Sequence, residues 1–251
     1  MRSLTPCAGQ VYGIDGCRSG WVIAKREDAG IGFEILNDLK PVFSQITPDC
    51  TIAIDIPIGV PEDSPRICDA EARVFLGWPR SSSIFSPPVR SALSATTFQD
   101  ALNVNRKVAG IGISKQAFFI MSKIREVDEL MSPSGQRCLK EVHPEVTFAS
   151  LAGVPMRFSK KSKTGRAERL AVLRHNGIAL SEERLIAERQ RLGMAGVAVD
   201  DLIDAAACLV TALHIRAGRS RSLGFPAQTD RKGLRMEIVT CSAQPKCAVV
   251  R

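Results

Sequence analysis

The stretch VYGIDGCRSGW, residues 11–21, decides how the fold of this chain is interpreted. A short apolar segment leads to a single carboxylate, Asp15, and two glycines with small polar residues then turn the chain into a second apolar segment. Asp-Gly is also an ordinary hairpin sequence, so the stretch alone predicts two strands joined by a tight turn. At the end of the first strand, Asp15 is placed at the edge of a buried sheet, where an acid could bind a metal ion.

Three more strands are predicted along the chain, and acids follow two of them. The expected strands are Gln10–Asp15, Trp21–Arg26, Gly30–Leu36, Thr51–Ile56 and Cys138–Val142. The fourth is nearly all apolar, as a buried central strand is, and it carries Asp55 near its end. Glu141 or Glu145 lies at the end of the fifth strand, and the residues leave this choice open. Because open α/β sheets place ligand sites at the carboxyl ends of strands, we expect these acids to converge.

A late helix over residues 200–213 carries three more acids in its first turns. Asp200 is the expected N-cap, whereas Asp201 and Asp204 are three residues apart and share a face. Like charges on a closely packed helix face destabilise it unless a cation lies between them. The pattern therefore predicts that Asp201 and Asp204 belong to a metal site.

Two loops between these elements are rich in hydrogen-bond donors. Residues 77–90 hold two arginines, four serines and three prolines, and residues 159–166 form a basic loop without the spacing of a Walker A motif. Such donors suit phosphate groups. Between the loops, Ser114–Met131 is predicted as one continuous helix, with Lys123 and Glu126 on its solvated side.

Composition narrows the class of protein. The chain has 251 residues and a formal net charge of +8, which favours polyanionic partners through phosphate contacts. An aromatic content of 5% argues against a surface that stacks single-stranded bases. Eight cysteines without CxxC or zinc-finger spacing predict reduced core thiols. Without an apolar membrane-length run or a signal peptide, we expect a cytoplasmic protein with no membrane partner.

The order of elements is that of a ribonuclease H-like fold, and a family resemblance points the same way. GIDGCRSGW, IDIPIG, RSSSIFSPPVR, GISKQAFFIMSKIREVD, VHPEVTFASLAG, SKKSKTGR and DDLIDA, in this order, resemble the family called domain of unknown function 429, over about residues 11–240. The resemblance implies a mixed five-stranded α/β sheet flanked by helices, with a largely helical insertion between strands four and five. We expect one domain over residues 10–240, an insertion at about residues 57–137, a disordered N-terminus over residues 1–9 and a frayed tail over residues 241–251.

Members of that family are described as predicted nucleases, so the resemblance implies hydrolysis of phosphodiester bonds in nucleic acid, DNA or RNA, at a two-metal carboxylate site that takes Mg²⁺ or Mn²⁺. The acids that match by position are Asp15, Asp55, Glu145, Asp201 and Asp204, all but Glu145 being expected metal ligands. The expected substrate-binding residues are Arg18, Arg66, Arg80, Ser82, Arg90, Lys160 and Lys161.

Two other functions compete with the nuclease. A non-catalytic nucleic-acid-binding or scaffold protein could keep the fold without turnover. An actin-like phosphotransferase shares the strand core, and its first Asp-Gly hairpin wraps ATP phosphates. That class normally duplicates the core, and this chain has no second Asp-Gly hairpin. The oligomeric state is left open, with a homodimer among the options.

Overall fold

The computed structural model describes residues 9–27 and 30–242. Its strands are β1 (Val11–Cys17), β2 (Gly20–Glu27), β3 (Gly30–Leu36), β4 (Thr51–Asp55), β5 (Leu139–Glu141), β6 (Ser220–Thr229) and β7 (Arg235–Cys241). Its α-helices are α1 (Lys40–Phe43), α2 (Ile67–Leu76), α3 (Phe98–Ala109), α4 (Lys115–Phe119), α5 (Met121–Leu130), α6 (Pro144–Ala152), α7 (Lys163–His175), α8 (Glu182–Leu192) and α9 (Val199–Arg216). Short 3₁₀ turns lie at Arg80–Ser83, Arg90–Ala92 and Gly135–Arg137. No helix within the described residues is long and apolar enough to span a membrane.

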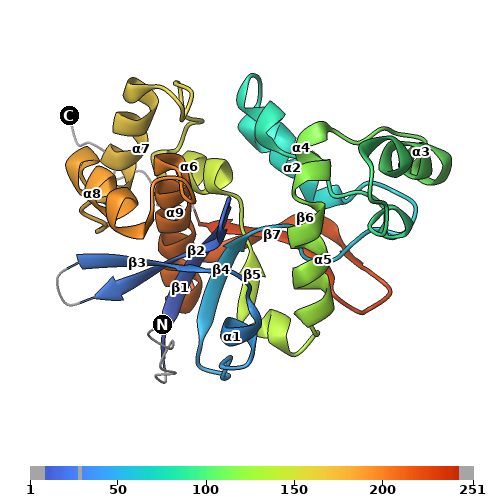
Figure 1. Cartoon of the computed structure of the whole chain (residues 1–251), viewed down its shortest axis with the longest axis horizontal. Coiled ribbons are helices and arrows are strands. Elements are labelled where there is room, and N and C mark those ends of the chain that lie inside the picture. The colour runs from blue at the N-terminus through green and yellow to red at the C-terminus, as the bar shows by residue number, and fades with distance from the viewer. Residues whose placement is uncertain (1–8, 28–29, 243–251) are drawn as a thin grey trace, which may run out of the picture.

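The central sheet has five strands in the order β3-β2-β1-β4-β5. β1 pairs antiparallel with β2 and parallel with β4, and β4 pairs parallel with β5. This register sets Asp15 directly beside Asp55. The predicted mixed five-stranded sheet is therefore confirmed, as is the neighbourhood of the first and fourth strands (Figure 1).

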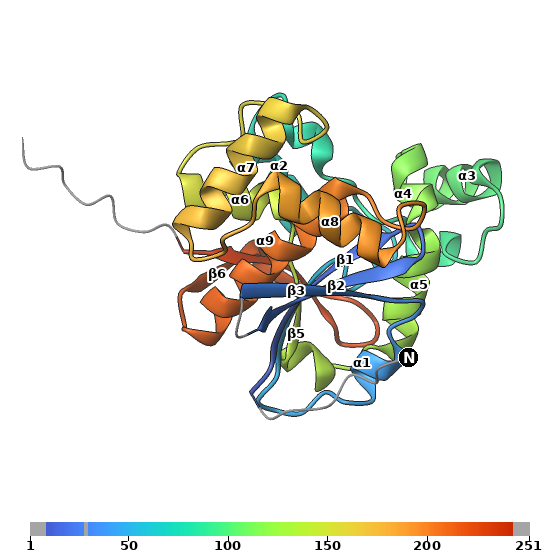
Figure 2. The ribbon, with the colours of Figure 1, turned by 60° about the vertical axis from the view of Figure 1, so that its left-hand side comes forward.

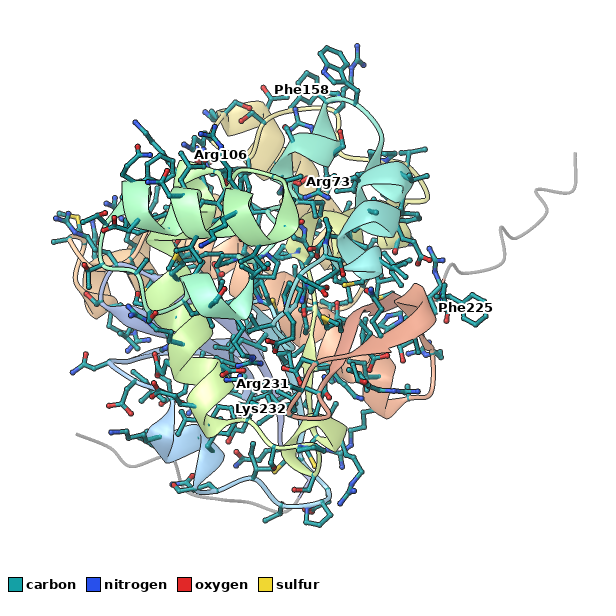
Figure 3. The ribbon with its side chains drawn as sticks, turned by 90° about the vertical axis from the view of Figure 1, so that its right-hand side faces the viewer. Arg73, Arg106, Phe158, Phe225, Arg231 and Lys232 are labelled. Atoms are coloured by element: carbon teal, nitrogen blue, oxygen red, sulfur yellow. The ribbon has the colours of Figure 1, made fainter. Side chains whose placement is uncertain are left out.

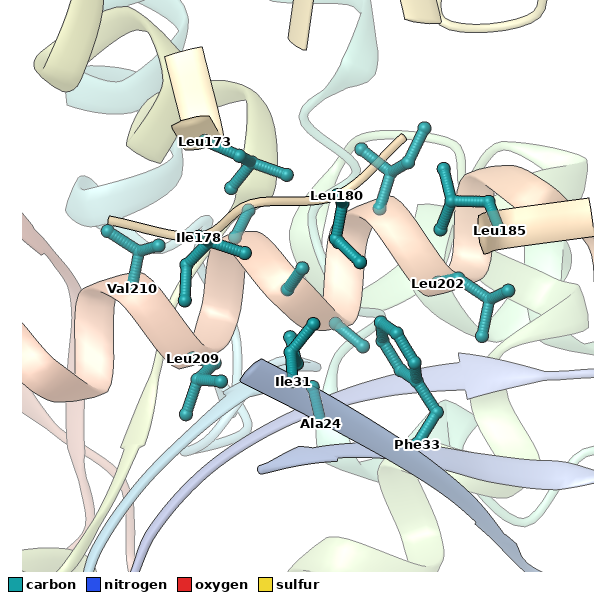
Figure 4. Packing of buried hydrophobic residues seen from close by; sticks show 14 of the residues in the cluster. Ala24, Ile31, Phe33, Leu173, Ile178, Leu180, Leu185, Leu202, Leu209 and Val210 are labelled. Carbon is teal, nitrogen blue, oxygen red and sulfur yellow. The ribbon is translucent and has the colours of Figure 1, made fainter. Parts of the chain in front are cut away.

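Helices cover both faces of this sheet (Figure 2). One face packs against α7, α8 and α9, and Figure 4 shows Leu202 and Leu209 of α9 close to Ile31 and Phe33 of β3. The other face, which includes Ile14 and the buried Trp21, packs against α5. Because side chains alternate between the faces of a strand, each strand places one apolar set in each core.

α9 lies unusually close to β1, and Gly13 makes this approach possible. A Cβ atom added at Gly13 would lie 2.1 Å from the Leu209 backbone nitrogen and 2.3 Å from the Ala205 carbonyl oxygen. Ala53 and Cys208, both fully buried, continue the same small-residue contact between β4 and α9. Asp15 and Asp55 lie two residues beyond Gly13 and Ala53, so their side chains are on the face that α9 covers.

The predicted helical insertion between β4 and β5 is confirmed, and it contains α2, α3, α4 and α5 (Figure 1). Residues 114–131, however, form two helices and not one: α4 ends at Phe119 and α5 begins at Met121, with Ile120 (φ −93°, ψ 0°) as the turn residue between them. The break lets Phe118 stack edge-on against Phe98 of α3, while Ile124 and Val127 stay buried against the sheet.

Two other details of the sequence interpretation are corrected. The N-cap of α9 is Ala198 and not Asp200, because the Asp201 carboxylate accepts a hydrogen bond from the Ala198 N–H at 2.8 Å. The expected N-terminal disorder over residues 1–8 and the frayed tail over residues 243–251 lie outside the described residues. Cys241, assigned to that tail, ends β7, and the Ser242 N–H donates to the Arg219 carbonyl at 2.9 Å.

β6 and β7 form a separate two-stranded sheet that packs against α2, α6 and β5. Glu71 of α2 accepts hydrogen bonds from the Gly224 and Phe225 N–H groups of β6, at 2.7 and 3.1 Å. Figure 3 shows the connection between the two strands, which carries Arg231 and Lys232. The hairpin thus closes one side of the helical insertion.

Candidate functional site

Three carboxylates from distant parts of the chain converge at the carboxyl edge of the central sheet. Asp15 lies near the end of β1, Asp55 is its register partner on β4, and Asp204 lies on the second turn of α9, which covers both strands. Asp15 is 8% exposed and Asp204 only 2% exposed. The predicted convergence of these three residues therefore matches their placement in the fold.

The hydrogen bonds of these acids leave oxygen atoms without partners. Asp15 Oδ1 accepts the Gly16 N–H at 2.8 Å. Asp204 Oδ2 is in direct contact with the ammonium group of Lys160, which reaches in from the loop before α7. Asp204 Oδ1 is buried without a hydrogen-bond partner in the structure. Burying an unpaired carboxylate oxygen is costly, so this atom is available for a ligand.

The electrostatics of the site follow from burial and crowding. Burial, followed by the charges of Asp55 and Asp204, raises the pKa of Asp15 well above its usual value. Burial also raises the pKa of Asp55 to about 6, although His143 and Lys160 oppose the shift. The Asp204 carboxylate raises the pKa of Lys160 above its usual value. Keeping three clustered carboxylates ionised beside a single lysine thus costs free energy.

Asp201, the fourth expected metal ligand, has a different position. Its Oδ2 atom caps the start of α9 through the Ala198 N–H, and it is half-buried. Burial raises the pKa of Asp201 to about 6, against the Ala198 hydrogen bond, and Asp200 and Asp204 add to the rise. Asp201 does not line the cleft described below. The structure therefore shows a capping role for it, and the metal role stays a prediction.

The structure distinguishes the two glutamates near the end of β5, Glu141 and Glu145. Glu141 is held by the guanidinium of Arg66, at 2.7 and 2.8 Å, and by the Ile58 N–H at 2.7 Å. Glu145, in the first turn of α6, pairs through Oε1 with Arg169 at 2.5 Å, while its Oε2 atom is buried without a partner in the structure. Both glutamates border the cleft, but only Glu145 has an oxygen left for a ligand.

A cleft of about 380 Å³ opens above these acids. Its walls come from the sheet edge, the loop after α2, the α4–α5 junction and the loop before α7. The expected substrate-binding residues Arg80, Lys160 and Lys161 line it. Its size falls within the range of small-molecule sites, and its floor is acidic while part of its wall is basic.

Of the other expected substrate-binding residues, two lie outside the cleft and two are engaged in ion pairs. Arg18 and Ser82 are exposed and outside the cleft lining. Arg90 is bound to Glu62, Asp128 and Asp230 at 2.9, 2.8 and 2.6 Å. Arg66 borders the cleft, but it is 1% exposed and its donors are committed to Asp69, Glu141 and the Ile58 carbonyl. The structure thus commits Arg66 and Arg90 to ion pairs within the fold, and a substrate-binding role for them stays a prediction.

Two cleft residues were not predicted as functional. Lys123, expected on a solvated face, donates to the Gly20 carbonyl at 2.5 Å and lies over the Trp21 ring; burial lowers the pKa of its ammonium group. Its neighbour Glu126 is also drawn inward, where it accepts the Trp21 Nε1–H at 3.0 Å. His143 lies in the cleft near Asp55, with Nε2 3.2 Å from the Ser83 carbonyl oxygen. The helical periodicity of residues 114–131 cannot predict this position of Lys123, because the Gly20 carbonyl that it contacts lies in the hairpin after β1.

A loop anchored by Arg169 carries Lys160 to the acids. Arg169, fully buried on α7, donates to the Phe158 carbonyl at 3.1 Å and to the Gly165 carbonyl at 2.9 Å, besides its pairing with Glu145. Gly165 allows close chain packing, since a Cβ there would lie 1.9 Å from the Ser159 carbonyl oxygen. Arg169 thus connects Glu145 of α6 to the basic loop over residues 159–166.

Within the described residues, no group of three or more His, Cys, Asp or Glu side chains has the spacing of a ready-made metal site. The donor set is nevertheless chemically suited to a hard divalent cation, which prefers carboxylate oxygens. Asp204 Oδ1 and Glu145 Oε2, both buried and without a partner in the structure, are the atoms that such a cation would satisfy. The residues present therefore fit Mg²⁺ or Mn²⁺.

A model of the family described as "Protein of unknown function (DUF429)" matches residues 13–229. The match begins in β1, ends with β6, and includes Asp15, Asp55, Glu145, Lys160 and Asp204. No curated protein and no solved structure matches the chain.

Proposed function

We propose that the chain, which belongs to the DUF429 family, is a metal-dependent nuclease that hydrolyses phosphodiester bonds of nucleic acid at the Asp15–Asp55–Asp204 site. The observation that carries the proposal is the convergence of these three carboxylates from β1, β4 and α9, of which Asp15 and Asp204 are buried and Asp55 is half-buried. Folding does not need such a cluster, because it raises the cost of burying charge. Acids collected at this cost are typical of functional sites.

Asp15, Asp55 and Asp204 would hold Mg²⁺ or Mn²⁺, and Glu145 Oε2 is the next available oxygen. A divalent cation, or a pair of them, activates a water and stabilises the leaving oxygen in phosphodiester hydrolysis. Asp201 stays a candidate ligand one helical turn before Asp204. The basic residues of the cleft have a different role in the proposal, which is to bind phosphate.

Lysine and arginine side chains of the cleft would bind the phosphate. Lys160 and Lys161 extend from the loop before α7, and Arg80 extends from the loop after α2, so the cations approach from two sides. Lys160 also balances the charge of Asp204 when the site is empty of substrate. His143 and Lys123 complete the wall beside Asp55 and Asp15, within reach of a bound phosphate.

The proposal is tested by the stability of the metal-free protein. The pKa of Asp55, raised to about 6 in the folded state, means that its contribution to stability is full below about pH 4 and is lost as the pH rises through 6. Asp55→Asn removes this penalty. In EDTA at pH 7.5 we expect the variant to be more stable than the wild type by about 1–2 kcal/mol, a rise of about 2–6 °C in melting temperature. The difference should vanish near pH 4.

Addition of Mn²⁺ should reverse this order, because the wild type gains binding energy that the variant lacks. Asp63→Asn, at an exposed aspartate, is the matched control and should follow the wild type in both conditions. A wild type whose melting temperature does not respond to millimolar Mn²⁺ or Mg²⁺ would count against the proposal.

The direct contact of Lys160 with Asp204 favours one second candidate, a non-catalytic nucleic-acid-binding protein. In that case the Lys160 ammonium neutralises the Asp204 carboxylate in place of a metal ion. Binding of nucleic acid that is unchanged by EDTA, with no cleavage of any substrate, would support this alternative. ATP added in the same melting experiment tests the phosphotransferase, which requires a stabilisation by ATP.

A further inference from the structure

Three exposed aromatic side chains lie next to cleft-lining residues along the chain. Trp78 is 91% exposed, Phe119 73% and Phe158 39%. Each lies within two residues of a cleft-lining residue, namely Arg80, Ile120 and Ser159. We call Trp78, Phe119 and Phe158 the aromatic rim.

The rim is made by three separate segments. Trp78 follows α2, Phe119 ends α4, and Phe158 precedes α7. Among the residues that the structure describes, four aromatic side chains are this exposed, and three of them are in the rim. The fourth, Phe225, lies on β6, far from Phe158 in Figure 3. Large aromatic side chains stabilise a fold by burial, so their concentration here indicates a binding surface.

Cations accompany these rings. Arg157 places its guanidinium 5.3 Å from the centre of the Phe158 ring. Lys160 and Lys161 follow on the same loop, and Arg80 is two residues from Trp78. Aromatic faces next to cations are the combination that binds single-stranded nucleic acid, because bases stack on the rings while the cations contact phosphates.

The depth of the acids favours the same ligand. Asp15 and Asp204 lie on the cleft floor and are almost inaccessible from outside. A phosphate group reaches them only if the backbone that carries it enters the cleft, which a flexible strand with unpaired bases can do more easily than a rigid duplex.

We propose that the aromatic rim stacks unpaired bases and that the site takes single-stranded nucleic acid. Trp78 is the principal stacking residue, since it has the largest and most exposed ring. The inference rests on the proposed function for the fate of the phosphate, but base stacking is measured separately from cleavage.

Intrinsic fluorescence gives a direct measurement, because the chain has two tryptophans and Trp21 is fully buried. The full chain is titrated in EDTA, where no cleavage occurs, with unlabelled oligothymidine of about 15 nucleotides. Stacking should quench the Trp78 emission. The quench should be absent in Trp78→Leu, whose remaining emission comes from Trp21 and reports that the fold is intact.

Affinity is measured in parallel by anisotropy of a labelled oligonucleotide. Trp78→Leu and Phe158→Leu should each weaken single-strand binding by about 5- to 100-fold, whereas Trp78→Phe should keep most of it. Phe225→Leu is the matched control for loss of an exposed ring and should change nothing. The blunt duplex of the same sequence should bind more weakly than the single strand.

If single strands quench the Trp78 emission and the rim variants bind them more weakly, but no substrate is cleaved in the presence of metal, the stacking proposal stands and the nuclease proposal fails. The opposite result is cleavage without quenching of Trp78, with equal affinity for duplex and single strand and no effect of Trp78→Leu. In that case the stacking proposal fails and the nuclease proposal stands. A lack of binding to both nucleic acids would overturn the inference.

Discussion

Asp15→Asn is expected to lower Mn²⁺- or Mg²⁺-dependent cleavage of nucleic acid by at least about 10²- to 10³-fold. Asparagine is close in shape and keeps the oxygen that accepts the Gly16 N–H, so the hairpin should be retained. What is lost is the negative charge at the centre of the acid cluster, between Asp55 and Asp204. A labelled panel of single-stranded and duplex DNA and RNA, with time courses in Mn²⁺, measures the loss.

The control for this variant is Asp63→Asn, which removes an exposed carboxylate outside the cleft lining. It should cleave at the wild-type rate. Melting curves recorded on the same samples show whether Asp15→Asn is folded. A folded Asp15→Asn protein that cleaves as fast as the wild type would remove Asp15 from the mechanism.

Arg66→Ala is expected to destabilise the protein by about 3–5 kcal/mol. Arg66 lies between Asp69 and Glu141, at 2.5 and 2.7 Å, and all three side chains are at most 5% exposed. Removing the cation leaves two carboxylates buried without compensation, which is far more costly than removing the whole group. The Ile58 carbonyl also loses its donor. Chemical denaturation at pH 7.5 measures the free energy of unfolding.

A triple variant separates charge from packing. Arg66→Met combined with Asp69→Asn and Glu141→Gln removes all three charges while keeping similar volume, and should recover a large part of the lost stability. A loss below about 1 kcal/mol for Arg66→Ala would show that the buried ion pairs are not structural. Arg66 would then return to the list of candidate substrate-binding residues.

Much of the fold could be predicted, because local patterns specify it. Apolar strands that end in turn residues, and an apolar helix that begins with acids, sufficed for the five-stranded sheet and for α9. The β6–β7 hairpin was harder. Of the residues of β6 only Leu223 is buried, so the period-2 pattern that marks a half-buried strand is weak there. The break at Ile120 accompanies the contact of Phe118 with Phe98 of α3, a tertiary contact that the local helical pattern does not reveal.

The acids of the site were found from their place at strand and helix ends, but their partners were not. The choice between Glu141 and Glu145 depends on Arg66 and Arg169, which are 75 and 24 residues away from them along the chain. Because its guanidinium is engaged in these ion pairs, Arg66 is not among the cations that the cleft offers to a ligand. Charge alone could not tell Lys160, which contacts Asp204, from Arg90, which is bound to three acids elsewhere.

Composition was a weak guide to the cleft mouth. A low aromatic content argues against base stacking only if the few rings are buried or scattered. Here the rings of Trp78, Phe119 and Phe158 are exposed, and each lies within two residues of a residue that lines the same cleft. This grouping, which composition does not record, carries the inference.

The central claim, a divalent metal between β1, β4 and α9, is tested most directly by anomalous diffraction from crystals soaked in Mn²⁺. The account predicts a peak within coordination distance, about 2.0–2.4 Å, of oxygens of Asp15, Asp55 and Asp204, with the Lys160 ammonium moved away from Asp204. The peak should be absent from Asp15→Asn crystals. An intact acid cluster without manganese at millimolar concentration, with Lys160 still on Asp204, would contradict the account.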